Sequence, residues 1–272
     1  MLDQPLRSLA FGAHPDDCDI LLGGMAIMWA RLGHQVTFVS ATNGDTGHYT
    51  MGGGPLARRR RDEAMRSAEI AGIAYQVLDI HNGQLMPTLE NRWRFVEIIR
   101  QAQPDLVVGH RPNDYHPDHR CVGQLVQDAA YTVTIPNVAA LTPHLETNPI
   151  FACFSDRFQR PYPFQADVIV DVDAVMPTKL EMLHCHTSQF YEWLPYNQGR
   201  LAKVPEGDEE RKAWINELWG VRSRSLADAH RPALIARYGA ERGQAVRNAE
   251  AIEISEYGAQ PTPEELATLF PF

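Results

Sequence analysis

Short apolar runs and longer segments with helical apolar spacing alternate along the first half of the chain. Four runs predict β-strands: Leu6–Gly12, Gln35–Ala41, Tyr75–Ile80 and Asp105–Gly109. The segments that follow them predict helices: Ile20–Leu32, Leu56–Gly72, Leu89–Ala102 and Cys121–Tyr131. This alternation is typical of an α/β protein with right-handed crossovers. We therefore predict a Rossmann-like, mostly parallel sheet with flanking helices and an active site at the C-terminal edge of the strands.

The second half of the chain has a less regular pattern. It predicts two further strands and one helix: Ile150–Phe154, Asp167–Asp173, and a helix from Asp173 to His186. Glu206–Ala251 is charged and has helical periodicity. We predict a core domain over residues 1–190 and a helical extension over residues 191–272 that packs on it. The extension could cover the sheet, form a wall of the active site, or make a contact in a homo-oligomer.

Composition limits the classes of function. The chain has 272 residues, a hydrophobic fraction of 44% and a net charge of −9, which disfavours binding to nucleic acid or to anionic membranes. No apolar run approaches the roughly 20 residues of a membrane span. Met1–Ala13 has the pattern of a first strand and not of a signal peptide. The four cysteines lack CxxC spacing and indicate reduced thiols in a cytoplasmic protein.

Two polar loops follow predicted strands. His14-Pro15-Asp16-Asp17 comes after the first strand, and His116-Pro117-Asp118-His119 comes after the fourth. Parallel strands open at one edge of a sheet, which would bring His14, Asp17 and His119 within reach of one ion. Two histidines and a carboxylate with an open fourth position are typical of catalytic zinc. Helix N-capping would explain one carboxylate per loop, but not a histidine in both loops.

The paired loops resemble the motifs of the PIG-L/LmbE family of zinc-dependent N-acetylglucosamine-type deacetylases. The resemblance extends over most of residues 6–190 and includes three other segments: Arg60–Ala64, Pro104–Val108, and Lys179 to Gln189 with its His-x-Ser-Gln motif. It implies a hydrolase that removes an acetyl group from an N-acetyl amino sugar or its conjugate. It also implies a zinc ion, although a His/Asp site also accepts Fe²⁺, Co²⁺ or Mn²⁺.

The resemblance and the spacing suggest a role for each residue of the loops. Asp17 matches the His-x-x-Asp spacing of a metal ligand, which leaves Asp16 as the general base that later gives its proton to the amine. His116 is placed to donate a hydrogen bond to the developing oxyanion. Two further carboxylates are candidates to orient the ligand imidazoles: Asp114 and Asp118.

Five other residues are expected to face the substrate: Arg60, Asp45, His48, Asn82 and His186. Arg60 matches the family's Arg-x-x-Glu pattern, although a run of arginines is often simply solvated. His48 belongs to the polar segment Thr42–Pro55, which could equally be a flexible surface loop. His186 belongs to the His-x-Ser-Gln motif, and its alternative is a histidine at a helix end.

Three functions compete at this stage. The first is a zinc-dependent deacetylase acting on a small N-acetylated amino sugar or glycoconjugate. The second is another single-metal hydrolase, an esterase or an amidase acting on a non-sugar substrate. The third is a metal- or sugar-binding protein without catalysis, and the presence of a candidate base at Asp16 counts against it.

Overall fold

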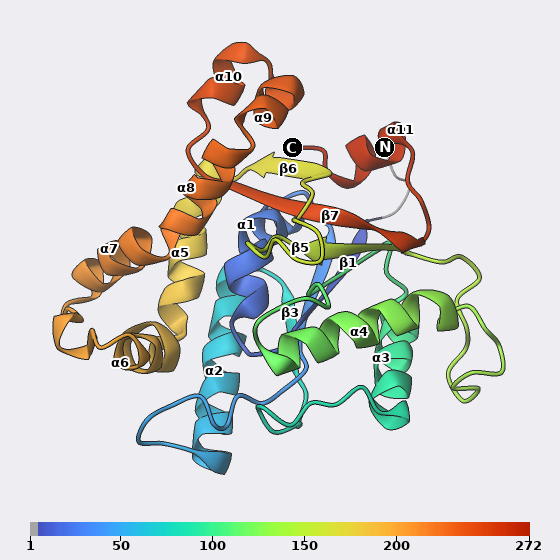
Figure 1. The fold of residues 1–272 in the computed structure, drawn as a ribbon, viewed down its shortest axis with the longest axis horizontal. Coiled ribbons are helices and arrows are strands. Elements are labelled where there is room, and N and C mark those ends of the chain that lie inside the picture. The colour runs from blue at the N-terminus through green and yellow to red at the C-terminus, as the bar shows by residue number, and fades with distance from the viewer. Residues whose placement is uncertain (1–4) are drawn as a thin grey trace.

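A seven-stranded sheet forms the centre of the computed structural model, which describes residues 5–272 (Figure 1). The beginning of the stretch Met1–Ala13 therefore lies outside the described residues. The strand order is β3-β2-β1-β4-β5-β7-β6. The strands are β1 Arg7–Gly12, β2 Gln35–Ser40, β3 Ala74–Val77, β4 Leu106–Gly109, β5 Ile150–Phe154, β6 Val168–Asp171 and β7 Ala249–Gly258. Strands β1 to β5 run parallel, whereas β7 is antiparallel to both of its neighbours.

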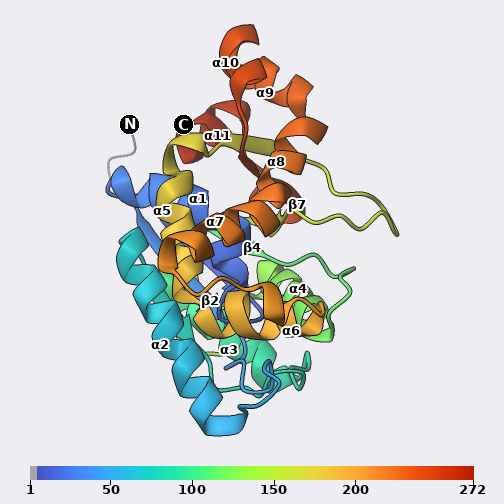
Figure 2. The same ribbon diagram turned by 90° about the vertical axis from the view of Figure 1, so that its left-hand side faces the viewer.

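Helices cover both faces of the sheet. They are α1 Asp17–Arg31, α2 Gly53–Ala71, α3 Leu89–Ala102, α4 Pro117–Thr132, α5 Met176–Cys185, α6 Leu194–Asn197, α7 Asp208–Leu218, α8 Gly220–Ala229, α9 Arg231–Tyr238, α10 Ala240–Ala245 and α11 Pro263–Leu269. Helices α5 and α7 lie side by side on one flank of the molecule (Figure 2).

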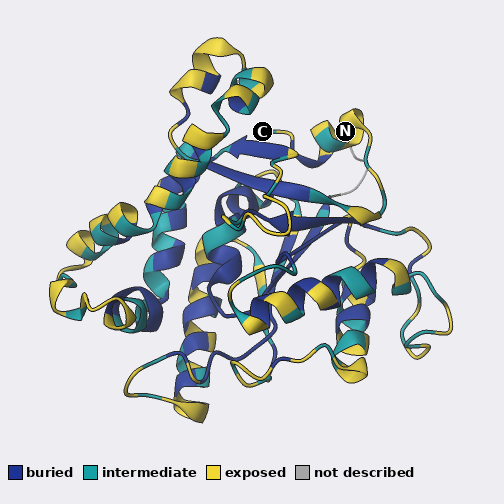
Figure 3. Cartoon of the chain, in the orientation of Figure 1, coloured by how far each residue is buried: buried dark blue, intermediate teal, exposed yellow. Residues whose placement is uncertain are grey.

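The alternation of β1 explains the two layers. Leu6, before β1, and Ala10 pack into one apolar core with residues of α1, α5 and α11, whereas Leu9 and Phe11 pack into another with residues of α3 and α4. Successive side chains of a strand point to opposite faces of a sheet, so a strand covered on both faces is apolar throughout. The central strands are accordingly buried and the outer helix surfaces exposed (Figure 3).

The predicted order of strands and helices is confirmed. Leu89–Ala102 and Ile150–Phe154 match α3 and β5 to the residue, and α2 ends at the left-handed Gly72, with φ of 71°. The helix predicted to begin at Asp173 starts with a 3₁₀ turn, Asp173–Val175, before α5. The predicted α/β fold with a mostly parallel sheet is therefore present.

The helical prediction for Glu206–Ala251 is wrong at its end, where β7 begins. Ala and Glu residues such as Ala249 and Glu250 favour helix in isolation, but pairing with β5 and β6 overrides that preference. The Glu250 carboxylate is buried and accepts hydrogen bonds from the backbone of α1 and from Lys179. Residues 191–272 thus supply a strand of the central sheet as well as helices, and the boundary at residue 190 stays a prediction.

The C-terminal tail packs against this same domain. Phe270 is buried beside Trp29 of α1, with ring centroids 5.5 Å apart, and the Trp29 indole donates to the Leu269 carbonyl at 2.7 Å. None of the helices in residues 5–272 has the length and apolar character needed to cross a bilayer.

Candidate active site

The polar loops meet where the order of the strands reverses. Strands β1 and β4 are neighbours, although β2 and β3 come between them in the chain. Ligands of open α/β sheets bind at the carboxyl ends of strands at such a switch point. His14 and Asp17 follow β1, and His119 lies in the first turn of α4, which follows β4.

Three side-chain atoms form a compact donor set. His14 Nδ1 lies 3.4 Å from Asp17 Oδ2, His119 Nε2 lies 3.3 Å from His14 Nδ1, and His119 Nε2 lies 3.5 Å from Asp17 Oδ2. Ligands about 2.0–2.2 Å from a tetrahedral zinc ion are about 3.3–3.6 Å from one another. The separations of this donor set therefore fit one ion with three protein ligands.

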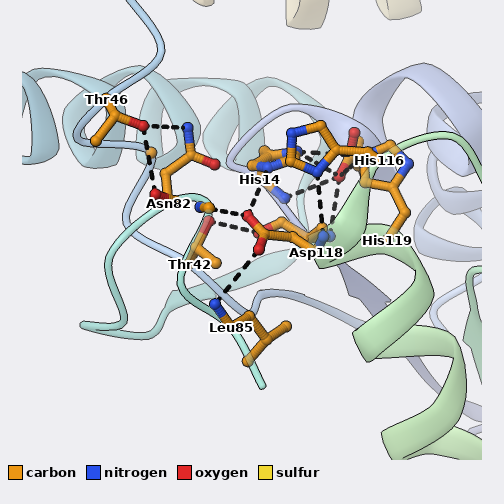
Figure 4. A network of polar contacts seen from close by, with 12 residues as sticks. His14, Thr42, Thr46, Asn82, Leu85, His116, Asp118 and His119 are labelled. Atoms are coloured by element: carbon orange, nitrogen blue, oxygen red, sulfur yellow. Dashed lines mark hydrogen bonds and ion pairs between the residues drawn. The ribbon is translucent and has the colours of Figure 1, made fainter. Parts of the chain in front are cut away.

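The other nitrogen of each ligand imidazole faces a carboxylate. His14 Nε2 is 3.2 Å from Asp118 Oδ2, and His119 Nδ1 is 3.1 Å from Asp114 Oδ1. Asp118 also accepts hydrogen bonds from the backbone of Gly83 and Leu85 (Figure 4). Burial would raise the pKa of Asp118, but the His14 and Gly83 hydrogen bonds hold it below its usual value. This arrangement fixes the imidazole orientations, as in carboxylate–histidine–metal triads.

Asp17 is held in its ionised form. Burial alone would raise its pKa, but His119 and His14 beside it keep the pKa well below the usual value. Its Oδ2 also accepts hydrogen bonds from the backbone of Ala13 at 2.9 Å and of His14 at 2.8 Å. An ionised carboxylate is the form in which an aspartate binds a metal.

Asp16 is buried and lines the cleft that lies beside the donor set. It occupies the N-cap position of α1, yet its side chain makes no capping hydrogen bond. Its Oδ1 lies 3.2 Å from Arg60 Nη2. Burial raises the pKa of Asp16 more than Arg60 lowers it, and Asp17 raises it further. A carboxylate whose pKa is shifted upward is better suited to act as a general base.

His116 presents one nitrogen to the cleft. Its Nδ1 accepts the Asp118 backbone N–H at 3.2 Å and so caps α4. Burial and the nearby His14 lower the pKa of His116 to about 4. The ring is therefore neutral at pH 7, and because Nδ1 is an acceptor, the proton lies on Nε2. This nitrogen can donate a hydrogen bond to an oxyanion.

His110 belongs to the site and was missed in the sequence analysis. Its Nε2 lies 3.3 Å from Asp17 Oδ2 and accepts the Ala13 N–H at 3.2 Å, and its ring stacks on His119 with centroids 4.1 Å apart. Burial, followed by His119, lowers the pKa of His110 to about 4. His110 directly follows β4, at the same edge of the sheet as the two polar loops, and this position in the sequence could have identified it as a site residue.

A cleft of about 410 Å³ opens above these residues. Its walls include aromatic and polar residues that sequence reasoning did not single out: Tyr115, Phe158, Gln189, Trp193, Trp219, Arg111, Arg157 and Arg222. Most of them come from the irregular segment after β5 and from residues 189–222. These regions are brought to the strand edge by long-range packing, which local sequence patterns do not report.

Two residues predicted to face the substrate are instead engaged in loop structure. His48 Nε2 lies 2.7 Å from Glu192, and its Nδ1 accepts the Thr50 N–H at 3.1 Å. Asp45 binds His81 at 2.5 Å and the Asn82 backbone at 3.0 Å. Neither lines the cleft. The predictions for His48 and Asp45 are therefore corrected: both fix the long loop after β2.

His186 is also displaced from its predicted position. It is fully buried, with Nε2 3.3 Å from Asp19 Oδ1, and does not line the cleft. Its motif contributes in another way. Ser188 binds Glu63 of α2 through its backbone and hydroxyl, and Gln189 reaches the cleft.

Arg60 and Asn82 do line the cleft. Arg60 is only 2% exposed and contacts Asp16 and the Gly44 carbonyl, so it is not a solvated arginine. Asn82 donates to Thr46 at 2.9 Å, and its Oδ1 has no hydrogen-bond partner among the described residues. An unpaired buried acceptor is costly and would gain from a donor such as a sugar hydroxyl.

Known proteins resemble this chain in sequence and in fold. The family model described as PIG-L: GlcNAc-PI de-N-acetylase matches residues 9–130. A diacetylchitobiose deacetylase of Thermococcus kodakarensis is 34% identical over 207 residues, which cover 70% of this chain and 74% of the relative. A 4-oxalmesaconate hydratase of Pseudomonas putida is 24% identical over 211 residues, 74% of this chain and 81% of that protein.

A solved structure extends the match over nearly the whole chain. The N,N'-diacetylchitobiose deacetylase from Pyrococcus horikoshii aligns with a TM-score of 0.70 and 26% identity, covering 92% of this chain and 83% of that one. The fold and the site define an α/β protein with a candidate metal-binding donor set and a buried carboxylate beside it. The chain belongs to the PIG-L family.

Proposed function

We propose that this protein is a metal-dependent hydrolase that removes the acetyl group from an N-acetyl amino sugar of the N-acetylglucosamine type or from its conjugate. The observation that carries the proposal is the donor set of His14, Asp17 and His119 with the buried carboxylate of Asp16 beside it, which Arg60 orients and which makes no capping hydrogen bond. The deacetylase relatives support the reaction type. We propose zinc as the ion, with Fe²⁺, Co²⁺ and Mn²⁺ as alternatives.

His14, Asp17 and His119 would hold the ion. When bound, it would supply a Lewis acid that polarises the acetyl carbonyl and lowers the pKa of a water to about 7. Asp16 takes the proton of the attacking water as the C–O bond forms. The protonated Asp16 then gives this proton to the nitrogen as the C–N bond breaks, which yields acetate and a free amine. His116 Nε2–H donates to the carbonyl oxygen while negative charge develops on it.

The cleft supplies groups for a sugar. Asn82 Oδ1 is an acceptor without a partner, and Trp193 and Tyr115 offer aromatic surface. A volume of about 410 Å³ lies in the range of about 300–1,000 Å³ that small-molecule sites occupy. We propose a small N-acetylated sugar or glycoconjugate as substrate and retain a cytoplasmic location as a prediction.

The direct test is release of acetate from a panel of N-acetylated sugars by the metal-loaded protein, with and without chelator. We expect acetate release that the chelator abolishes and that re-added metal restores. Activity on acetyl esters or non-sugar amides alone would replace the proposal with the other single-metal hydrolase. The hydratase relative adds 4-oxalmesaconate to the panel, and hydration of this compound without any deacetylation would refute the proposed function.

His116→Asn should lower kcat by about 10²–10³-fold, because removing one oxyanion donor typically has this effect. Asparagine is a good N-cap residue, so α4 keeps its cap while the cleft loses the Nε2 donor. Steady-state kinetics together with metal analysis test this expectation. A variant with unchanged kcat would remove His116 from the mechanism.

Arg60→Lys should lower kcat more than it raises KM. The sequence pattern predicted that Arg60 faces the substrate, but its guanidinium lies against Asp16 and the Gly44 carbonyl. A lysine keeps the charge but cannot reproduce the planar fork, so Asp16 loses its fixed orientation. Arg61→Lys is the matched control, because Arg61 is the exposed neighbour on α2. A rise in KM with constant kcat would instead support direct binding of the substrate by Arg60.

A further inference from the structure

Two arginines line the cleft without a carboxylate partner. Arg157 lies in the segment after β5, and Arg222 lies in the first turn of α8. Within residues 5–272, neither guanidinium has an aspartate or glutamate oxygen within the 4.0 Å of an ion pair. The Arg222 guanidinium donates to the carbonyl of Ser155, a neutral acceptor that leaves its charge uncompensated.

The environment of Arg222 disfavours an unpaired charge. Burial lowers its pKa and the like charge of Arg157 lowers it further, whereas Asp156, Asp114 and Asp17 raise it from beyond ion-pair distance and do not offset the burial. Charged groups removed from water are costly unless they are paired. Arg157 is exposed to solvent and Arg222 is half-buried, so an anion in the cleft would meet one guanidinium that has lost much of its hydration and a second that is still hydrated.

Other charges nearby do not fill this role. Arg111 also lines the cleft, but its guanidinium lies 3.0 Å from Asp156 and 3.7 Å from Glu253 and donates to the Tyr162 carbonyl at 2.7 Å. Arg111 engages Asp156 through Oδ1, while Asp156 Oδ2 has no hydrogen-bond partner among residues 5–272. Arg111, Arg157 and Arg222 still outnumber Asp156 and Glu253 here. The acidic groups Asp17 and Asp114 face the histidines of the proposed metal site. The uncompensated charge on this wall is therefore positive.

We propose that Arg157 and Arg222 bind an anionic group of the substrate, a carboxylate or a phosphate, while the acetamide lies at the metal donors. This inference rests on the proposed deacetylase function and specifies its substrate class as N-acetyl amino sugar conjugates with an acidic aglycone. Both arginines lie outside residues 9–130, which match the family model. The preference for an acidic substrate would therefore depend on the segment after β5 and on α8, which lie outside the matched part of the chain.

The kinetic test compares neutral and acidic substrates with the metal-loaded protein. The probes are N,N'-diacetylchitobiose, N-acetylglucosamine 1-phosphate and N-acetylglucosaminyl L-malate, which separate a phosphate from a carboxylate. We expect kcat/KM to be about 10- to 100-fold higher for an acidic substrate, the size expected for charge-assisted hydrogen bonds. Arg222→Gln and Arg157→Gln should remove this advantage by raising KM for the acidic substrates about 10-fold more than KM for the neutral substrate.

Arg224→Gln is the matched control. Arg224 lies on the same helix α8, binds the side chain and carbonyl of Asn216, and does not line the cleft. It should leave all three substrates unaffected. If wild type favours the neutral sugar and Arg222→Gln changes no substrate, the anion site is refuted while deacetylation stands.

A binding measurement separates the anion site from the reaction. Trp193 and Trp219 line the cleft, so their fluorescence can follow titration with L-malate or inorganic phosphate. Arg222→Gln should weaken binding by about tenfold, and added salt should weaken it in wild type. Binding that is equal in wild type and both variants would place the anion elsewhere and overturn the proposal. Arginine-dependent binding without deacetylation of any sugar would refute the proposed function and keep the anion site.

Discussion

Asp16→Asn is expected to keep its metal and to lose turnover by about 10²–10⁴-fold, the usual contribution of a general base. The amide is nearly isosteric with the carboxylate but cannot accept the proton of the attacking water. Asp16 makes no capping hydrogen bond, so helix α1 does not depend on its charge. Acetate release and elemental analysis of the same preparation measure both parts of the expectation.

Asp17→Asn is the variant to compare with Asp16→Asn, because the two aspartates are assigned different roles. It should lose metal, because its Oδ2 belongs to the donor set with His14 and His119. If Asp16→Asn lost metal while Asp17→Asn retained it, the roles of the two neighbouring aspartates would have to be exchanged. Full activity in Asp16→Asn would show that another group takes the proton.

The central fold was predictable because its signals are local. Parallel strands buried on both faces appear as continuous apolar runs, and the helices carry regular apolar spacing. The donor set followed from the fold, since loops after parallel strands open at one edge. His14 and His119 are 105 residues apart in the chain, yet His119 Nε2 lies 3.3 Å from His14 Nδ1 in the structure. The histidines and aspartates in the loops after two parallel strands were therefore the strongest sequence signal for the location of the site.

The substrate-facing residues were less predictable because residue type does not give side-chain direction. His48 turns to Glu192, 144 residues away, and His186 turns to the buried Asp19. Both histidines belong to segments near the cleft, yet distant acidic partners hold them away from it. Only the tertiary structure reveals those partners.

Strand β7 and the cleft walls were missed for a related reason. Glu250 is compatible with a helix in isolation, and its strand conformation depends on pairing with β6 and on hydrogen bonds from α1 and Lys179. Arg222 reaches the cleft only because α8 packs beside β7. Such contacts have no periodic signature in the sequence.

His14→Ala and His119→Ala are each expected to abolish stoichiometric metal binding, whereas the purified wild-type protein should carry about one divalent ion per chain. Each substitution removes one of three donors whose separations fit a tetrahedral ion. Asp118→Asn provides a graded comparison, because it leaves the three donors in place but weakens the contact that orients His14, and it should lower metal affinity by about 10- to 100-fold. His144→Ala is the control, since His144 does not line the cleft and lies 3.7 Å from the exposed Glu146. Elemental analysis of folded protein, checked by circular dichroism, gives the content and identity of the ion. Unchanged metal in both histidine variants would mean that the ion lies elsewhere, and His110 with His116 would then be the next ligands to test.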